Sequence, residues 1–420
     1  MNQTSAKDIY YAVSDSRMER GKGIYLYDSD GNGYIDCASG SFNLSLGYSH
    51  PAVVEAIKEQ ADQLIHARSG FQHPLINTLA SRLVGLAPKS ITSAHLKVTG
   101  GSTANEGAIR MAQRATGRRD IITLFRSHVG QTMTMASLSG NAFRKASVPF
   151  PSDTGTQVPD PYCYRCFYGQ QRESCGLMCV DRIDDFIEFA SSGSVAAILV
   201  EPISANGGNI VSPEGYFGKL RDLCDQHGIK LILDELQTGI GRTGHMFAAE
   251  YFGVEPDGMT LGKGLGGSGA QVAAILASDG LSGLPADDHS FTFGANIMSA
   301  AAAVATLDVI DDPAFLANVR RTGALIMERM ESLKSDFSCI GDVRGVGLMI
   351  GVEIIDADGR ENAKLTNHLA DKAMEFGLII RTSRNGLGNV LKFRPPLIIT
   401  ADEATLMCDR FEALMRAHGM

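Results

Sequence analysis

The sequence has no apolar run that approaches the ~20 residues of a membrane-spanning helix. Positive charge is not in excess either: the formal net charge of the 420 residues is -9 at pH 7, and no basic stripe follows the chain. These absences argue against a membrane span and a general nucleic-acid binder, and they leave small molecules as the expected partners. The first 23 residues show no secretory leader, so we expect a cytoplasmic protein.

Internal repeats, low-complexity tracts and long linkers are absent as well. With 44% hydrophobic and 20% charged residues, the composition is that of an ordinary globular protein. The length suffices for a large core and a second, smaller domain.

Cysteines are few, and they fall into two groups. One group stands among apolar neighbours and is expected to be buried thiols: Cys37, Cys224, Cys339 and Cys408. The other group has the pattern C-x2-C-x8-C-x3-C: Cys163, Cys166, Cys175 and Cys179. This pattern is suggestive of a zinc knuckle, but its irregular spacing favours a cysteine-rich surface excursion, and we expect no metal.

Short aliphatic runs alternate with helical patterns through the middle of the chain. The runs that indicate buried strands span residues 94–101, 119–125, 195–202, 229–236, 256–263 and 271–278. Helical patterns at 103–117 and 213–228 lie between them, and this alternation predicts an α/β fold with a mainly parallel sheet. After an alanine-rich helix at 297–312, the pattern changes to that of a small α+β domain.

Two of the predicted strands end in charged side chains. "KLILDELQ" places Asp234 and Glu235 directly after aliphatic residues, and "GMTLGKG" places Lys263 between glycines. A buried charge is costly unless it is paired, has a shifted pKa or is used covalently. An ion pair between the lysine and an acid would satisfy this need, and so would a catalytic pair.

A third element carries the pattern of an anion cradle. "VTGGSTANEG" joins a predicted strand to a helix through Gly100, Gly101, Ser102 and Thr103. Such residues let backbone N–H groups approach an anion at the helix N-terminus, although the hydroxyls also suit ordinary capping. A buried lysine, an acid one strand earlier and this cradle together fit pyridoxal phosphate.

"GIGRTG" matches the dinucleotide pattern G-x-G-x-x-G at Gly239, Gly241 and Gly244. That fingerprint belongs in the turn directly after the first strand of its fold, whereas here five residues intervene and the motif lies deep in the domain. An NAD-dependent dehydrogenase is therefore the alternative from a different class of function, and it would leave the lysine unexplained.

The order of "LILDELQTGIGRTG", "LGKGLGG" and "FTFGAN" closely resembles the class III aminotransferases of the fold-type I pyridoxal-phosphate enzymes. The resemblance extends from "YDSDGNGYIDCASG" to "VLKFRPPLIIT". It implies a large, mainly parallel seven-stranded sheet domain at 56–311, and a small α+β domain built from 312–420 and the N-terminal segment 1–55. It also implies a homodimer.

The resemblance further implies roles for single residues. Lys263 would be the Schiff-base lysine, and Asp234 the partner of the pyridine nitrogen. Thr292 would reach the cofactor phosphate of the neighbouring subunit. The other implied cofactor contacts are Gly101, Ser102, Thr103, His128, Glu201, Leu236 and Gln237.

Several positions depart from the family pattern. Thr103 stands where an acid is usual, and His128 takes the position of the ring-stacking aromatic residue. Lys392 takes the position of the arginine that binds the substrate carboxylate, and Arg394 follows two residues later. Asn206 stands where members that handle both glutamate and an ω-amine often have glutamate. The candidate substrate residues are Ser41, Phe42, Lys392 and Arg394.

We therefore expect an aminotransferase that moves an amino group between an amine or amino-acid donor and an oxo acceptor. The departures favour a substrate unlike an α-amino acid on one half-reaction, such as an ω-amine or an amino sugar. Epimerases, phospholyases and decarboxylases of the same family are the alternatives, since they share the cofactor chemistry and differ in the bond that breaks at Cα.

Overall fold

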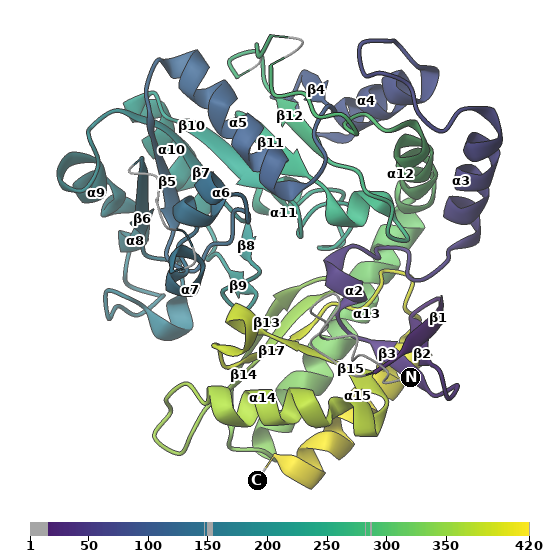
Figure 1. Ribbon diagram of the computed structural model, residues 1–420. Coiled ribbons are helices and arrows are strands. Elements are labelled where there is room, and N and C mark those ends of the chain that lie inside the picture. The colour runs from purple at the N-terminus through teal and green to yellow at the C-terminus, as the bar shows by residue number, and fades with distance from the viewer. Residues whose placement is uncertain (1–15, 147, 149–153, 282, 286–287, 420) are drawn as a thin grey trace, which may run out of the picture.

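The computed structural model describes residues 16–146, 148, 154–281, 283–285 and 288–419, so the predicted N-terminal segment 1–55 lies partly outside the described residues. Its centre is a seven-stranded sheet in the order β4-β12-β11-β10-β7-β5-β6 (Figure 1). The strands are β4 Ser93–His95, β5 Asp120–Leu124, β6 Gly155–Val158, β7 Val195–Val200, β10 Lys230–Asp234, β11 Gly258–Leu261 and β12 Ala274–Ala277.

This sheet confirms the predicted α/β class. Neighbouring strands run parallel except at β12, which is antiparallel to both β11 and β4. Strands β5, β7, β11 and β12 are buried along their whole length, which explains their continuous aliphatic sequences. The predicted runs contain five strands of this sheet and overlap only the last two residues of β4, because the aliphatic residues there follow the strand. They miss β6, whose sequence "GTQV" has no aliphatic signal.

Helices cover both faces of the sheet. Ile121, Leu199 and Ile232 pack in one apolar cluster with α5, whereas their neighbours along the strands pack in another cluster with α10. Alternate strand residues point to opposite faces, so α5 and α10 lie on opposite sides. The helices of this half are α3 Pro51–Gln63, α4 Pro74–Leu86, α5 Gly101–Thr116, α6 Met133–Leu138, α7 Ala142–Lys145, α8 Met178–Asp181, α9 Ile183–Phe189, α10 Tyr216–His227, α11 Ala248–Phe252 and α12 Ile297–Ile310.

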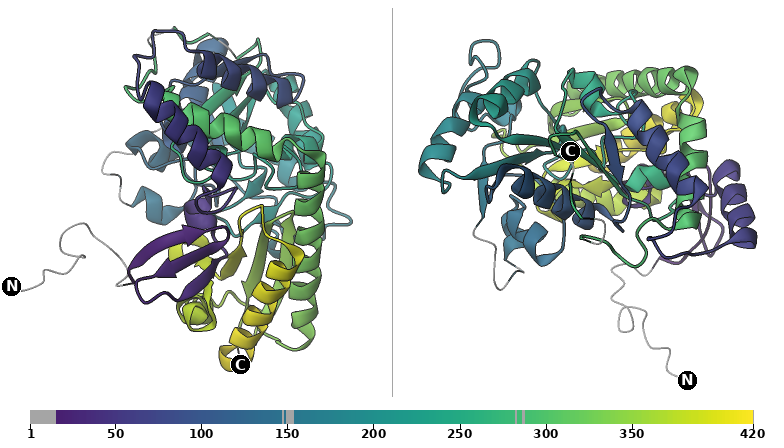
Figure 2. Two further views of the ribbon diagram at one scale, coloured as in Figure 1. Left: turned by 90° about the vertical axis from the view of Figure 1, so that its right-hand side faces the viewer. Right: turned by 90° about the horizontal axis from the view of Figure 1, so that it is seen from above.

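The C-terminal part forms smaller sheets against three long helices. The first three strands of the described chain join a strand of the C-terminal part in one sheet of order β1-β2-β3-β15, where β3 pairs with β15 in parallel (Figure 2). A second sheet has the order β13-β14-β17-β16. The strands are β1 Met18–Lys22, β2 Tyr25–Asp28, β3 Gly33–Asp36, β13 Ile340–Val346, β14 Met349–Ile354, β15 Leu378–Ile379, β16 Arg381–Thr382 and β17 Val390–Phe393.

The long helix α13 runs from the level of the large sheet down along the smaller sheets (Figure 2). The helices here are α2 Ser39–Phe42, α13 Pro313–Ser332, α14 Ala363–Lys372 and α15 Ala401–His418. A short pair, β8 Ile203–Ser204 and β9 Ile210–Val211, follows β7. No helix in the described part of the chain is both long and apolar enough to cross a membrane.

Candidate active site

The two adjacent acids at the end of β10 have different surroundings. Glu235 accepts hydrogen bonds from the backbone N–H groups of Ala248 (3.0 Å) and Ala249 (2.8 Å) and from the Thr238 hydroxyl (2.7 Å). It therefore caps α11 and holds the following loop. Burial raises the pKa of Glu235 to about 7, because these three donors offset only part of the desolvation cost.

Asp234 is 3% exposed and accepts hydrogen bonds from two donors in the described part of the chain. Its Oδ2 accepts from Asn105 Nδ2 at 2.7 Å, and its Oδ1 accepts from the N–H of Leu236 at 3.0 Å. Burial raises the pKa of Asp234, and the charge of Lys263 and the Asn105 hydrogen bond oppose that rise. Two donors fix the position of this carboxylate but do not offset its burial, so a nearby cation would stabilise its ionised form.

A second residue orients the amide that supports Asp234. Asn105 lies in the middle of α5, and its amide oxygen accepts from the Thr260 hydroxyl at 2.6 Å. Thr260 stands directly opposite Asp234 in the pairing of β10 with β11. The only sequence signal for this support is an asparagine inside a helix, where it is an unfavourable residue.

Lys263 follows β11 and begins a 3-10 turn, Lys263–Gly266. Its φ of 44° lies in the left-handed region, which costs a non-glycine residue about 1–2 kcal/mol. Burial lowers the pKa of Lys263, whereas the charges of Asp234 and Glu201 act in the opposite direction. The predicted lysine and acid thus lie in one site, where a larger share of the amine is unprotonated than in water.

The loop before α5 forms a cradle at the helix N-terminus, where the first N–H groups have no partner within the helix. A Cβ on Gly101 would lie 2.7 Å from Leu236 Cδ1, so only glycine allows this approach. Ser102 Oγ accepts from the N–H of Gln131 at 2.9 Å. The Thr103 hydroxyl accepts from the N–H groups of Thr99 and Gly100, both at 3.1 Å, so it fixes the loop.

Glu201 and His128 form a linked pair. Oε1 of Glu201 accepts from the N–H of His128 and Oε2 from the N–H of Ala205, both at 2.9 Å. Burial and the charge of Asp234 raise the pKa of Glu201 to about 7. Burial, with the charges of Arg144, Lys263 and Lys392, lowers the pKa of His128 to about 4. The imidazole is therefore neutral near pH 7, and its buried Nδ1 has no partner in the described structure.

Gln237 connects the site to the C-terminal sheet. Its amide oxygen accepts from Nη1 of Arg394, a contact that no sequence pattern indicated. Since that oxygen is used, the NH₂ group is the end that remains for a ligand. Arg394 is 1% exposed and Lys392 is 4% exposed, and Phe42 packs beside both.

Other predicted residues lie at the edge of this group. Thr292 and Ser41 are exposed. Asn206 is buried, with its Nδ2 unpartnered in the described structure and its carbonyl accepting from the N–H of Arg384 at 3.1 Å.

These residues fit pyridoxal phosphate in four respects. The N-terminus of α5 offers N–H groups to the phosphate. The buried Asp234 can pair with a cationic ring nitrogen, and the lowered pKa of Lys263 favours the neutral amine that reacts with an aldehyde. The fourth respect is the unpartnered Nδ1 of the buried His128, which shows that this side of the site lacks a ligand.

The "GIGRTG" segment has a packing role instead of opening a helix, as a dinucleotide fingerprint does. A Cβ on Gly241 would lie 2.9 Å from Ile310, and one on Gly244 would lie 2.3 Å from Arg320. Between them, buried Arg242 donates to the carbonyls of Leu348 and Pro395. The segment joins the large sheet to the C-terminal part.

The prediction of buried thiols is confirmed for the four scattered cysteines. The first four are buried, with free thiols: Cys37, Cys224, Cys339 and Cys408. The second four are partly buried, free, and line a cavity of about 30 Å³: Cys163, Cys166, Cys175 and Cys179. The described side chains include no group of three or more His, Cys, Asp or Glu that could hold a metal ion.

Comparisons with known proteins agree with this geometry. The family model "Aminotransferase class-III" matches residues 10–415. The chain is 36% identical over 400 residues to a leucine/methionine racemase of Thermococcus litoralis, covering 94% of this chain and 89% of that protein. It is 36% identical over 398 residues to an acetylornithine aminotransferase of Methanothermobacter thermautotrophicus, covering 93% and 92%.

Among solved structures, a PLP-bound amine transaminase from an uncultivated Pseudomonas species superposes with a TM-score of 0.91 at 29% identity. The match covers 100% of this chain and 98% of that one.

Proposed function

Because the chain belongs to the class III aminotransferase family and is a pyridoxal-phosphate-dependent transaminase, we propose that Lys263 and Asp234 carry its chemistry. The observation that carries this assignment is their convergence in one site: a strained, buried lysine with a lowered pKa and a buried acid held by Asn105 act on each other through their charges. The cofactor, when bound, supplies an electron sink for a carbanion at the substrate Cα.

The residues around the site divide the remaining tasks. Lys263 Nζ would hold the cofactor covalently and, as a free amine, would move a proton at the substrate Cα. Asp234 would keep the ring nitrogen protonated, and the N-terminus of α5, with Ser102, would hold the phosphate. The neutral His128 ring would lie against the cofactor ring, and the NH₂ group of Gln237 would donate to the phenolic oxygen.

We assign the donor to the ω-amines, amino acids or amino sugars, with an oxo compound as acceptor. Lys392 replaces a bidentate arginine fork with a point charge, which weakens the fit to an α-amino acid carboxylate. Amino-acid racemisation is the second candidate, because one of the relatives is a racemase.

The active unit is proposed to be a homodimer. The exposed Thr292 lies beside Phe293, an exposed aromatic side chain (67%), and burying that ring against a second subunit would stabilise a dimer. Thr292 would complete the phosphate site of the partner.

Single-turnover experiments test the proposal. The holoenzyme is mixed with one donor in ²H₂O without acceptor, and oxo product and Cα deuterium are both measured. Transamination predicts one equivalent of oxo product per active site and none with Lys263→Ala. Deuterated, racemised donor without oxo product would instead establish the racemase candidate.

A further inference from the structure

Three cations surround one aromatic ring where the site meets the C-terminal sheet. The guanidinium carbon of Arg394 lies 3.4 Å from the centroid of the Phe42 ring, Lys392 Nζ lies 5.2 Å from it, and the guanidinium carbon of Arg381 lies 5.4 Å from it. Phe42 belongs to α2, which lies between the seven-stranded sheet and the sheet of order β13-β14-β17-β16 (Figure 1). We call these four residues the Phe42 cage.

The strand register brings these charges together. Lys392 and Arg394 are two residues apart along β17 and its extension, so their side chains point to the same face. Strand β17 lies between β16 and β14. In this register Lys392 of β17 stands directly opposite Arg381 of β16, and opposite Gly351 of β14 on its other side. Like charges directly opposite each other destabilise a sheet, so this arrangement is costly without an anion.

No carboxylate of the described chain contacts these cations, and only the more distant charge of Glu201 offsets part of the cost. Within the described ranges, none of the three cations forms an ion pair with a carboxylate. Glu201 acts on Lys392 and Arg394 through its charge, but both of its oxygens accept from backbone N–H groups. Arg394 donates one nitrogen to Gln237, and its buried Nε and Nη2 have no partner in the described structure. A buried guanidinium with two unused nitrogens indicates a ligand.

We propose that the Phe42 cage binds a doubly charged, tetrahedral anionic group on the substrate, of the phosphate-monoester or phosphonate class. Three oxygens of such a group can each accept from one of the three cations, whereas a carboxylate has two oxygens. Arg381 is exposed, so the cage is open to solvent on its side. This subsite rests on the proposed function, because it places the anion on the molecule whose amine reacts at Lys263.

The cage lies within electrostatic reach of the reacting amine. The charge of Arg394 acts on Lys263, and the charge of Lys392 acts on His128. The cage and the reacting amine are therefore neighbours in one site.

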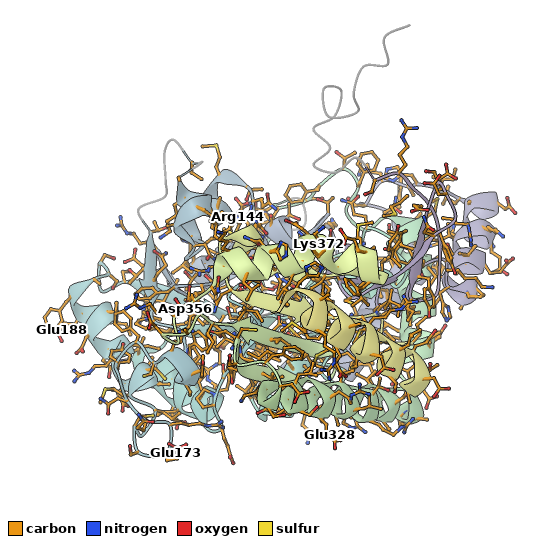
Figure 3. All side chains as sticks on the ribbon, turned by 90° about the horizontal axis from the view of Figure 1, so that it is seen from below. Arg144, Glu173, Glu188, Glu328, Asp356 and Lys372 are labelled. Atoms are coloured by element: carbon orange, nitrogen blue, oxygen red, sulfur yellow. The ribbon has the colours of Figure 1, made fainter. Side chains whose placement is uncertain are left out.

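Calorimetric titration of the holoenzyme tests the cage without any reaction. The probes are propylphosphonate and butyrate, which share an alkyl chain, lack an amine and differ in the charge and shape of the anion. We expect propylphosphonate to bind at least about tenfold tighter, the difference that one further charge-assisted contact supplies. Lys392→Met and Arg381→Met should each remove this preference. The control Lys372→Met, on α14 at the surface (Figure 3), should retain it. Equal or tighter binding of butyrate, or a preference that survives both cage variants, would overturn the proposal.

A second measurement separates the cage from the proposed function. Single turnovers are followed with 3-aminopropylphosphonate and with 4-aminobutyrate as donors. Reaction of both donors at the same kcat/KM would reject the cage and leave the transaminase assignment intact. Reaction of neither, combined with tight binding of propylphosphonate, would support the cage and count against these amines as donors.

Discussion

At the scale of residues, the adjacent acids Asp234 and Glu235 have separate tasks because their hydrogen-bond donors differ. Glu235 accepts from the backbone of α11, whereas Asp234 accepts from a side chain and stays open to a cation. Adjacent residues at the end of a strand point in opposite directions, so one acid serves the fold and the other the chemistry.

Asn105→Leu should lower kcat by roughly 10- to 100-fold, since a hydrogen bond to a charged group is worth about 1.5–3 kcal/mol. Without this donor the pKa of Asp234 rises further, and the acid holds its ionised form less well beside the ring nitrogen. Thr260→Val should have a smaller effect, because it removes a bond that orients the Asn105 amide but leaves the donor to Asp234 in place. Steady-state kinetics measure both variants, and an unchanged kcat in Asn105→Leu would refute the assignment.

Glu235→Gln should flatten the pH dependence of stability. The pKa of Glu235 is raised from 4.5 to about 7, so its contribution to stability is fully present below pH 4.5 and is lost as the pH rises through 7. The loss in the wild type is on the order of 3 kcal/mol, and glutamine does not ionise. Thermal unfolding between pH 4.5 and 8 tests this, with exposed Glu331→Gln as control. A variant that loses as much stability as the wild type over this range would contradict the account.

At the scale of elements, the junction of β10, β11 and α5 determines the shape of the cofactor cradle. Leu236 lies between two glycines: a Cβ on Gly101 would lie 2.7 Å from its side chain, and one on Gly262 would lie 2.9 Å from it. The three segments can approach one another this closely only with glycine at both positions.

Gly101→Ala should therefore weaken cofactor affinity by about tenfold or more, because it moves the N-terminus of α5 away from the phosphate. Adding Leu236→Ala should recover part of this loss, since it removes the atoms that the new Cβ meets. Gly85→Ala, in α4 with no atom near its Cβ, is the control. Equilibrium dialysis of the cofactor measures all three, and an unchanged dissociation constant in Gly101→Ala would contradict the close approach.

Elements with a strong local signal could be predicted from sequence, and contacts between distant elements could not. Aliphatic runs indicated β5, β7 and β10, because strands buried on both faces need apolar residues throughout. β6 has no such run, and the pairing of Arg394 with Gln237 joins residues 157 positions apart. Lys263 and Asp234 could be predicted because a charge at the end of a buried strand is conspicuous, whereas the support from Asn105 depends on how α5 packs on the sheet.

At the scale of the whole molecule, the proposed homodimer, in which Thr292 would complete the partner's active site, makes a prediction about mixed dimers. Lys263→Ala homodimers should be inactive, and Thr292→Val homodimers should bind cofactor more weakly. A dimer with one chain of each kind contains one intact site, with Lys263 from one subunit and Thr292 from the other. Mixing and reassociating the two variants should therefore restore up to half of the wild-type activity per mixed dimer. Activity no higher than the sum of the separate variants would show that Thr292 acts within its own subunit.

The most direct test of the central assignment identifies the lysine that binds the cofactor. Two buried lysines lie in the site, and we assign Lys263 to the cofactor and Lys392, as a cation beside Phe42, to the anion of the substrate. The holoenzyme is reduced with borohydride and digested, and the modified peptide is sequenced by mass spectrometry. We predict that the cofactor is attached at Lys263. Attachment at Lys392, or at no lysine, would contradict the account.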